Sequence, residues 1–204
     1  MNRSGGYDHP DYAGSLSEFG EPFELKRCGG WILKRSIPEL PYRDGLGCYP
    51  LFACRDWQLL PSDLADLQDE LITLSMVTDP FAKVDQDYLQ TCFDIVQPFK
   101  NHYVLEFDQS WEGSIDRRHR QKIRHSLKDL SIEISDDPPS FLDEWTKLYD
   151  QLIQRHNITG IRAFSKESFR KQLGIPGAVL VVGKLQGEVV GANLVLTNND
   201  VSYD

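Results

Sequence analysis

The sequence lacks any apolar run long enough to cross a membrane, and it lacks a recognisable export leader. Its longest apolar run, Ala178 to Val182, has the length of a strand, whereas a membrane helix needs about 18 apolar residues or more. The first residues show no charged-then-apolar pattern and no cleavage site. These absences exclude a membrane-embedded class, so we expect a soluble, cytoplasmic protein with no membrane partner.

Cysteine is scarce and follows no metal-binding pattern. Cys28, Cys48, Cys54 and Cys92 form no C-x-x-C pair, and no histidine stands at ligand spacing from them. The pattern disfavours both a zinc site and a disulfide framework, so we expect reduced, mostly buried thiols and no metal. Ser-His-Asp, Walker and paired-carboxylate signatures are missing from the sequence as well.

Positive charge is in the minority. The 204 residues include 22 Lys and Arg against 31 Asp and Glu, a formal net charge of −9. The average field of such a chain repels phosphates, which excludes a protein that binds nucleic acid over its whole surface. One segment breaks the trend, because six basic residues and no acidic ones lie between Arg117 and Lys128.

Periodicity predicts a mixed order of helices and strands. Residues 1–22, rich in Gly, Ser, Asp and Tyr, are expected to form a disordered tail. The turn Cys28-Gly29-Gly30 predicts a hairpin between strands 23–27 and 31–35. Further strands are expected over 49–54, 77–81, 102–107, 131–134, 178–184 and 188–197, with a last one starting at Val201. Helices are expected from Ser62 to about residue 74, over 86–96, 111–128 and 141–155, and in a short segment that Ser165 caps.

The helix expected over 111–128 has the strongest pattern in the chain. Its apolar residues recur at multiples of four and form a narrow seam. His119 is in line with that seam, which predicts a partly buried histidine. A core histidine and a catalytic base are both compatible with this position. The seam residues are Trp111, Ile115, Ile123 and Leu127.

The basic residues of the same helix have two interpretations. Glu112 and Asp116 in the first turn, with the basic residues after them, match the helix dipole, as expected for a solvated surface helix. Alternatively the helix steers an anionic substrate, with Arg117, Arg120 and Arg124 as the candidate ligands.

Three segments together resemble a known family. They are the basic helix 117–128 with the strand 131–134, the helix 141–149 followed by Phe164 and Ser165, and the hairpin 180–192 with its Gln186-Gly187-Glu188 turn. In this order they are similar to tandem-GNAT acyltransferases of the FemAB-like type. The resemblance covers roughly residues 117–204 well and the first hundred only in outline.

The resemblance implies an α+β, GNAT-like fold, with a mostly antiparallel mixed sheet flanked by helices. We expect a degenerate first subdomain over 23–136 and an incomplete second one over 137–204. It also implies N-acyl transfer from acyl-CoA, for example acetyl-CoA, to a small-molecule or peptide amine. The thioester would lie between two splayed strands whose backbone amides polarise its carbonyl. The Gly-rich pyrophosphate turn of the family would follow Asp204 and does not occur in this sequence.

Two alternatives remain open beside acyl-CoA chemistry. One is Fem-type transfer from an aminoacyl-tRNA, which the basic helix could guide. The other is a non-catalytic remnant or binding module. Among single residues, Tyr49 lies where relatives shape the acceptor pocket, and Tyr203 is a candidate proton donor. For Tyr49 a packing or turn role is the favoured explanation.

Overall fold

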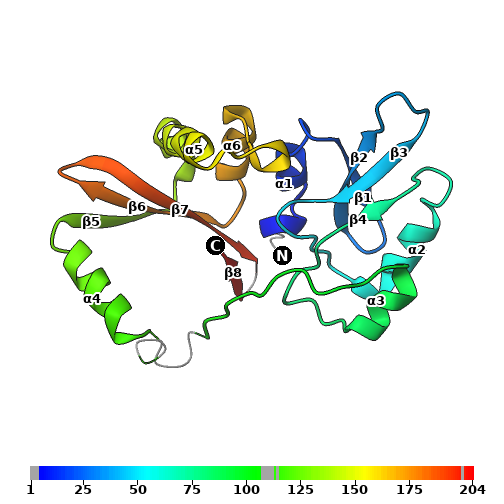
Figure 1. Cartoon of the computed structure of the whole chain (residues 1–204), viewed down its shortest axis with the longest axis horizontal. Coiled ribbons are helices and arrows are strands. Elements are labelled where there is room, and N and C mark those ends of the chain that lie inside the picture. Colours follow the sequence, from blue (N-terminus) through cyan, green and yellow to red (C-terminus); the bar gives the residue numbers. More distant parts are fainter. Residues whose placement is uncertain (1–4, 107–112, 114, 199) are drawn as a thin grey trace.

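The computed structural model describes residues 5–106, 113, 115–198 and 200–204, which form two four-stranded sheets with helices around them (Figure 1). The strands are β1 Glu21–Leu25, β2 Gly30–Ser36, β3 Arg43–Gly47, β4 Leu74–Ser75, β5 Leu130–Ser135, β6 Ala178–Leu185, β7 Glu188–Asn198 and β8 Val201–Tyr203. The helices are α1 Pro10–Ser15, α2 Leu60–Ala65, α3 Gln86–Cys92, α4 Arg117–Ser126, α5 Leu142–His156 and α6 Lys166–Leu173, and the 3₁₀ turns are η1 Gly6–Asp8, η2 Trp57–Leu59, η4 Pro138–Phe141 and η5 Gly160–Arg162. The expected α+β class is confirmed.

The first sheet has the order β1-β2-β3-β4. The predicted hairpin is confirmed: Gly29 takes a φ of +72°, which favours glycine, and its N–H donates to Leu25 O at 2.7 Å. The pairs β1–β2 and β2–β3 are antiparallel, whereas β4 pairs with β3 in parallel after the crossover through α2. Gly47 makes this pairing possible, because a Cβ there would lie 2.6 Å from Met76 Cβ.

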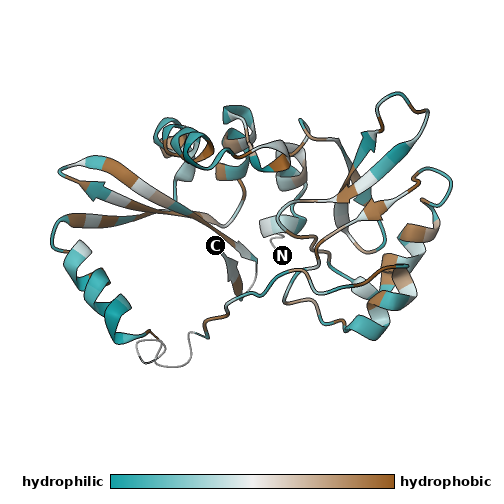
Figure 2. Cartoon of the chain, viewed as in Figure 1, coloured by the Kyte–Doolittle hydropathy of each residue, from teal (hydrophilic) through white to brown (hydrophobic). Residues whose placement is uncertain are grey.

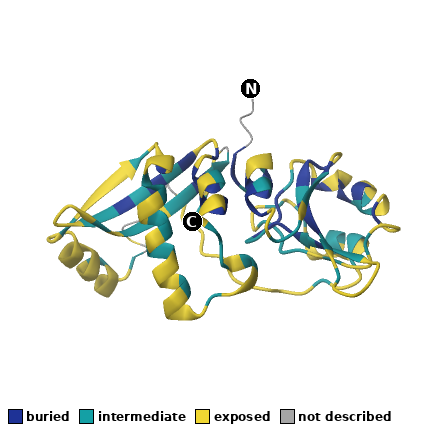
Figure 3. Cartoon of the chain, turned by 90° about the horizontal axis from the view of Figure 1, so that it is seen from above, coloured by how far each residue is buried: buried dark blue, intermediate teal, exposed yellow. Residues whose placement is uncertain are grey.

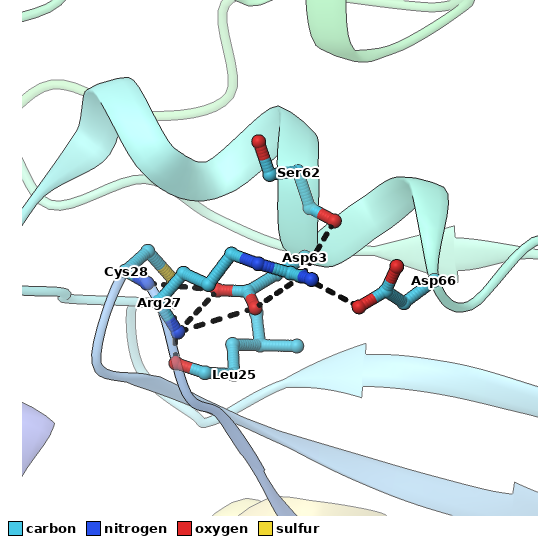
Figure 4. Close-up of polar contacts among 6 residues, drawn as sticks. All are labelled: Leu25, Arg27, Cys28, Ser62, Asp63 and Asp66. Carbon is cyan, nitrogen blue, oxygen red and sulfur yellow. Dashed lines mark hydrogen bonds and ion pairs between the residues drawn. The ribbon is translucent and has the colours of Figure 1, made fainter.

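Asp63 fixes α2 to the turn of this hairpin (Figure 4). The carboxylate is buried, with 6% of the residue exposed, and accepts hydrogen bonds from Cys28 N at 2.8 Å and from Arg27 N at 3.1 Å. The Arg27 guanidinium also bonds the exposed Asp66, at 2.5 Å. One carboxylate therefore satisfies two turn amides that the β-ladder leaves unpaired.

The second sheet is an antiparallel meander of order β5-β6-β7-β8. Helices α5 and α6 lie over one of its faces. Helix α4, which directly precedes β5 in the chain, lies on the other side of the sheet (Figure 1). Leu180 and Val182 point to the helices and are fully buried in one cluster with Leu173 and, more loosely, Trp145. Ser165 caps α6 as predicted, its Oγ accepting from Ser168 N at 3.1 Å.

The two sheets are joined by a shared core around α1. This core contains Leu16 and Leu33 from the first half and Ile175 and Leu196 from the second. Figure 3 shows buried residues inside both halves and also between them. Lys171 of α6 also donates to the carbonyl of Gly14 in α1, at 3.0 Å.

The expected disordered tail is wrong for residues 5–22. They form η1, α1 and the start of β1, and Tyr12 is only 4% exposed. The boundary expected at residue 136 is also wrong, because β5 pairs with β6 and so belongs to the second sheet. Residues 1–4 of the expected tail lie outside the described residues.

Several other expected elements are shorter or differ in kind. Residues 49–54 contain only a single bridge, at Phe52, and residues 102–106 form no strand; Phe107 lies outside the described residues. Helix α2 starts at Leu60, so Ser62 is not its cap, and α3 ends at Cys92 because Phe93 turns to extended backbone. By contrast, the expected strands in the second half and α5 are confirmed within a few residues.

Candidate functional site

The residues expected to form the site are divided between two regions. One region is α4, which precedes β5, the outer edge strand of the second sheet (Figure 1). It carries Arg117, His119, Arg120 and Arg124. Tyr203 lies on β8, at the opposite edge of that sheet, next to the first half of the chain. The structure therefore does not bring the basic helix and the tyrosines together.

Helix α4 has no buried residue. The predicted partly buried His119 is wrong: its side chain is 69% exposed and pairs with Asp116 at 2.9 Å. The seam residues Ile123 and Leu127 are 44% and 53% exposed, because no other described element packs on this helix. The helix begins at Arg117, later than expected, because Asp116 lies before its first turn and caps it by accepting from His119 N at 3.0 Å. Trp111 lies outside the described residues.

Tyr49 and Tyr203 meet through two further tyrosines at the boundary between the halves. The Tyr7 ring packs edge-on against Tyr203, with centroids 5.1 Å apart, and against Tyr12, at 4.9 Å. The buried Tyr12 donates its hydroxyl to Tyr49 O at 2.6 Å. Two carboxyl residues complete the group, which we call the junction site: Tyr7, Asp8, Tyr12, Tyr49, Asp79 and Tyr203.

Asp79 links the two sheets directly. Tyr203 donates its hydroxyl to Asp79 Oδ2 at 2.9 Å, and Phe81 N donates to Asp79 Oδ1 at 2.9 Å. The Phe81 ring lies edge-on to the Tyr203 ring, with centroids 5.8 Å apart. Burial, together with the charge of Asp79, raises the pKa of Tyr203 well above its ordinary value. Tyr203 therefore stays a neutral hydroxyl that donates a hydrogen bond to a carboxylate.

The pKa values of three further junction residues are raised as well. Burial raises the pKa of Tyr7 to about 12 and raises the pKa of Tyr12 well above its ordinary value. It also raises the pKa of Asp8, although nearby Arg55 opposes this. Asp8 is 7% exposed and accepts from Asn198 Nδ2 at 3.2 Å. Little water reaches these groups, so their electrostatic interactions are strong.

Beside Asp79 the parallel pair of strands opens. Leu46 pairs with Ser75, and Phe52 forms a bridge with Thr78. Between these two contacts the chain advances six residues on the β3 side and three on the β4 side. The pairing closes again with Asp79 N donating to Phe52 O at 3.0 Å. We call the segment from Cys48 to Leu51, which bows out between these contacts, the excursion.

One buried backbone donor in the excursion, the N–H of Leu51, donates no hydrogen bond within the described part of the chain. Leu51 is 3% exposed. Buried unpaired N–H groups are rare and favour a site for an incoming acceptor. The arrangement combines this backbone donor with a carboxylate, Asp79, that follows directly on the neighbouring strand.

No sequence pattern indicated a functional role for Asp79, Asp8, Tyr7 or Tyr12. Asp79 precedes Pro80 and has the appearance of a turn residue, and the other three fall in the expected tail. Only the unusual density of tyrosine and aspartate near the N-terminus could have drawn attention to them.

The helix starts near the parallel pair do not fit a pyrophosphate. Asp56 caps η2, ahead of α2, and Asp85 caps α3 by accepting from Tyr88 N at 2.8 Å. Carboxylates at these positions repel phosphate where the helix ends would otherwise attract it. Among the residues with described positions, no group of three or more His, Cys, Asp or Glu is arranged to hold a metal ion. None of the described helices could span a bilayer.

No protein-family model matches the chain, and no curated protein matches it either.

Proposed function

We propose that the chain carries out N-acyl transfer from a thioester donor such as acetyl-CoA to an amine, at the junction site. The observation that supports this most directly is the excursion. Its buried Leu51 N–H, which donates to no described residue, is suited to stabilise the negative charge that develops on a thioester carbonyl oxygen. The resemblance to GNAT enzymes implies splayed strands in the terminal sheet, whereas the opening on which this proposal rests lies between β3 and β4 of the first sheet.

Asp79 and Tyr203 have separate roles in this proposal. The attacking amine forms a C–N bond to the thioester carbon, the C–S bond breaks, and the thiolate leaves. Asp79 accepts the proton that the amine nitrogen loses. Tyr203 fixes the carboxylate through its hydroxyl at 2.9 Å and is a positioning residue. A cationic amine acceptor also suits a site that contains Asp8 and Asp79.

The proposal assigns a site to the thioester end of the donor only. Asp56 and Asp85 oppose phosphate binding at the neighbouring helix starts, so the nucleotide part of CoA has no assigned ligands. A truncated thioester without phosphates should therefore serve about as well as acetyl-CoA. The alternative donor, a charged tRNA, is favoured only by the exposure of Arg117 and Arg124 on α4.

The test is acyl transfer to a panel of amines, with product followed by mass spectrometry. Asp79→Asn is expected to lower kcat by about 10²-fold or more, a typical loss for a proton-transfer residue. Tyr203→Phe is expected to lower kcat less, because it removes only the hydroxyl that positions the carboxylate. Tyr88→Phe is the matched control, because it removes a tyrosine hydroxyl that donates to Trp57 O at a site away from the junction. It should leave kcat unchanged.

Two results would reject the proposal. If folded wild-type protein transfers no acyl group from acetyl-CoA or from the truncated thioester, the chain acts as a binding module. If transfer occurs only with a charged tRNA and is lost in Arg117→Glu with Arg124→Glu, the Fem-type alternative is correct.

A further inference from the structure

Charge is separated along the molecule. Residues 56–94 contain nine acidic side chains and a single basic one, Lys83. Residues 117–128 contain six basic side chains and no acidic one. The acidic stretch builds α2 and α3, which lie at one end of the molecule, and the basic stretch is α4, at the other end (Figures 1 and 2). The two stretches cannot meet within one chain in this fold.

Most basic side chains of α4 form no ion pair with the residues whose positions the structure describes. Arg117, Arg118, Lys122, Arg124 and Lys128 make no ion pair with any residue that the structure describes. Arg117 and Arg124 are two turns apart and lie within about 20° of each other around the helix. Next to them, Ile123 and Leu127 leave apolar surface open to water.

The acidic end has matching features. Asp69, Asp87 and Asp94 are exposed, and they form no hydrogen bond or ion pair within the described residues. Apolar surface again lies beside the charges, since Ile72 is 54% and Ile95 80% exposed. Each end thus offers unpaired charges of one sign with uncovered isoleucine side chains nearby.

We propose that α4 docks on the α2–α3 end of a second copy of this chain. The two surfaces are opposite in charge and similar in their apolar content, which favours association of one with the other over association of either with itself. The contact is head-to-tail, so it leads to a closed ring or to a growing chain of copies. Because the charges are exposed, the association is weak and depends on salt.

An anionic polymer is the competing occupant of α4. The chain's net charge of −9 disfavours it, because a polymer long enough to cover the helix also meets the acidic remainder of the molecule. A second copy concentrates nine carboxylates in residues 56–94, so its contact with α4 is confined to that end.

Sedimentation velocity tests the proposal at about 0.01 M and about 1 M salt, where the Debye length is about 30 Å and about 3 Å. Association is expected at low salt and loss of association at high salt. The basic-end variant carries Arg117→Glu, Arg124→Glu and Lys128→Glu, and the acidic-end variant carries Asp69→Lys, Asp87→Lys and Asp94→Lys. Each variant alone should associate at least about tenfold more weakly than the wild type.

A mixture of the two variants is the decisive sample. The altered α4 of one variant matches the altered acidic end of the other, and the two unaltered ends also match, so mixing restores association. This excludes misfolding as the cause of the losses. The variant with Lys100→Glu, Lys147→Glu and Arg155→Glu has the same net charge as the basic-end variant and should associate like the wild type.

Three outcomes would overturn the proposal. They are a wild type that stays monomeric at low salt, a basic-end variant that associates normally, and a mixture that stays monomeric. If the monomeric wild type instead binds a fluorescent single-stranded RNA through α4, the helix serves an anionic polymer.

Discussion

Single residues at the junction site place titratable groups where water is scarce. Asp8 is the informative case, because its pKa is raised mainly by burial, while its oxygen still accepts from Asn198. Such a group prefers its neutral form in the folded state more than in the unfolded state. The free energy of unfolding therefore falls as the pH rises from the ordinary aspartate pKa of about 3.9 through the raised one.

Asp8→Asn should remove this cost and keep the acceptor oxygen. We expect the variant to match the wild type below pH 3.9, roughly, and to be more stable than it at neutral pH, with the difference growing through the window in between. Urea unfolding over a pH series measures this. Asp69→Asn, an exposed residue without a partner, controls for the change in net charge. A difference that is independent of pH would contradict the assignment.

At the level of elements, the sequence predicted best those helices and strands whose apolar periodicity and caps lie within their own segment. Helix α5 shows a clear apolar face, and Ser165 caps α6 through a neighbour three residues away. The strands of the second sheet pair with neighbours in the chain, apart from β5. Local periodicity and capping were enough to predict these elements.

Elements that depend on distant partners could not be predicted in this way. Helix α1 is short and weakly patterned, and Leu16 is buried only because Ile175 and Leu196 come to it from the other end of the chain. For the candidate site, Tyr49 and Tyr203 could be named from the sequence, but not their link through Tyr7 and Tyr12. The expected seam on α4 failed for the opposite reason, since no described element covers it.

The attachment of α2 to the first hairpin is a test at the scale of elements. Asp63→Ala removes the acceptor for two turn amides, on Arg27 and Cys28, and leaves at least the buried Cys28 N–H without a partner (Figure 4). A loss of about 2–4 kcal/mol in the free energy of unfolding is expected. Chemical denaturation measures it, with Asp66→Ala as the control. Asp66 bonds the same guanidinium but is exposed, so the control should change little. Equal losses in both variants would be inconsistent with the anchoring role.

At the scale of the whole molecule, the described residues form three apolar clusters, which differ in whether they join the two halves of the chain. One lies within the first half around Leu60, and one lies within the second around Leu180. The third, with Leu16, contains residues from both halves. The junction site lies beside this third cluster, so the relative position of Tyr49 and Tyr203 depends on it. We therefore expect the shared core to couple the two sheets energetically and to hold the candidate site together.

Leu16→Ala tests that coupling. Removing this fully buried side chain should lower the free energy of unfolding by about 2–5 kcal/mol and should reduce amide protection in both β2 and β6, as measured by hydrogen exchange. Leu60→Ala, equally buried but in the first-half cluster, should reduce protection in β2 and leave β6 largely unchanged. The comparison isolates position, because both substitutions delete the same atoms. If Leu16→Ala affected one sheet only, the halves would be independent, and a site that needs both Tyr49 and Tyr203 would lose its structural basis.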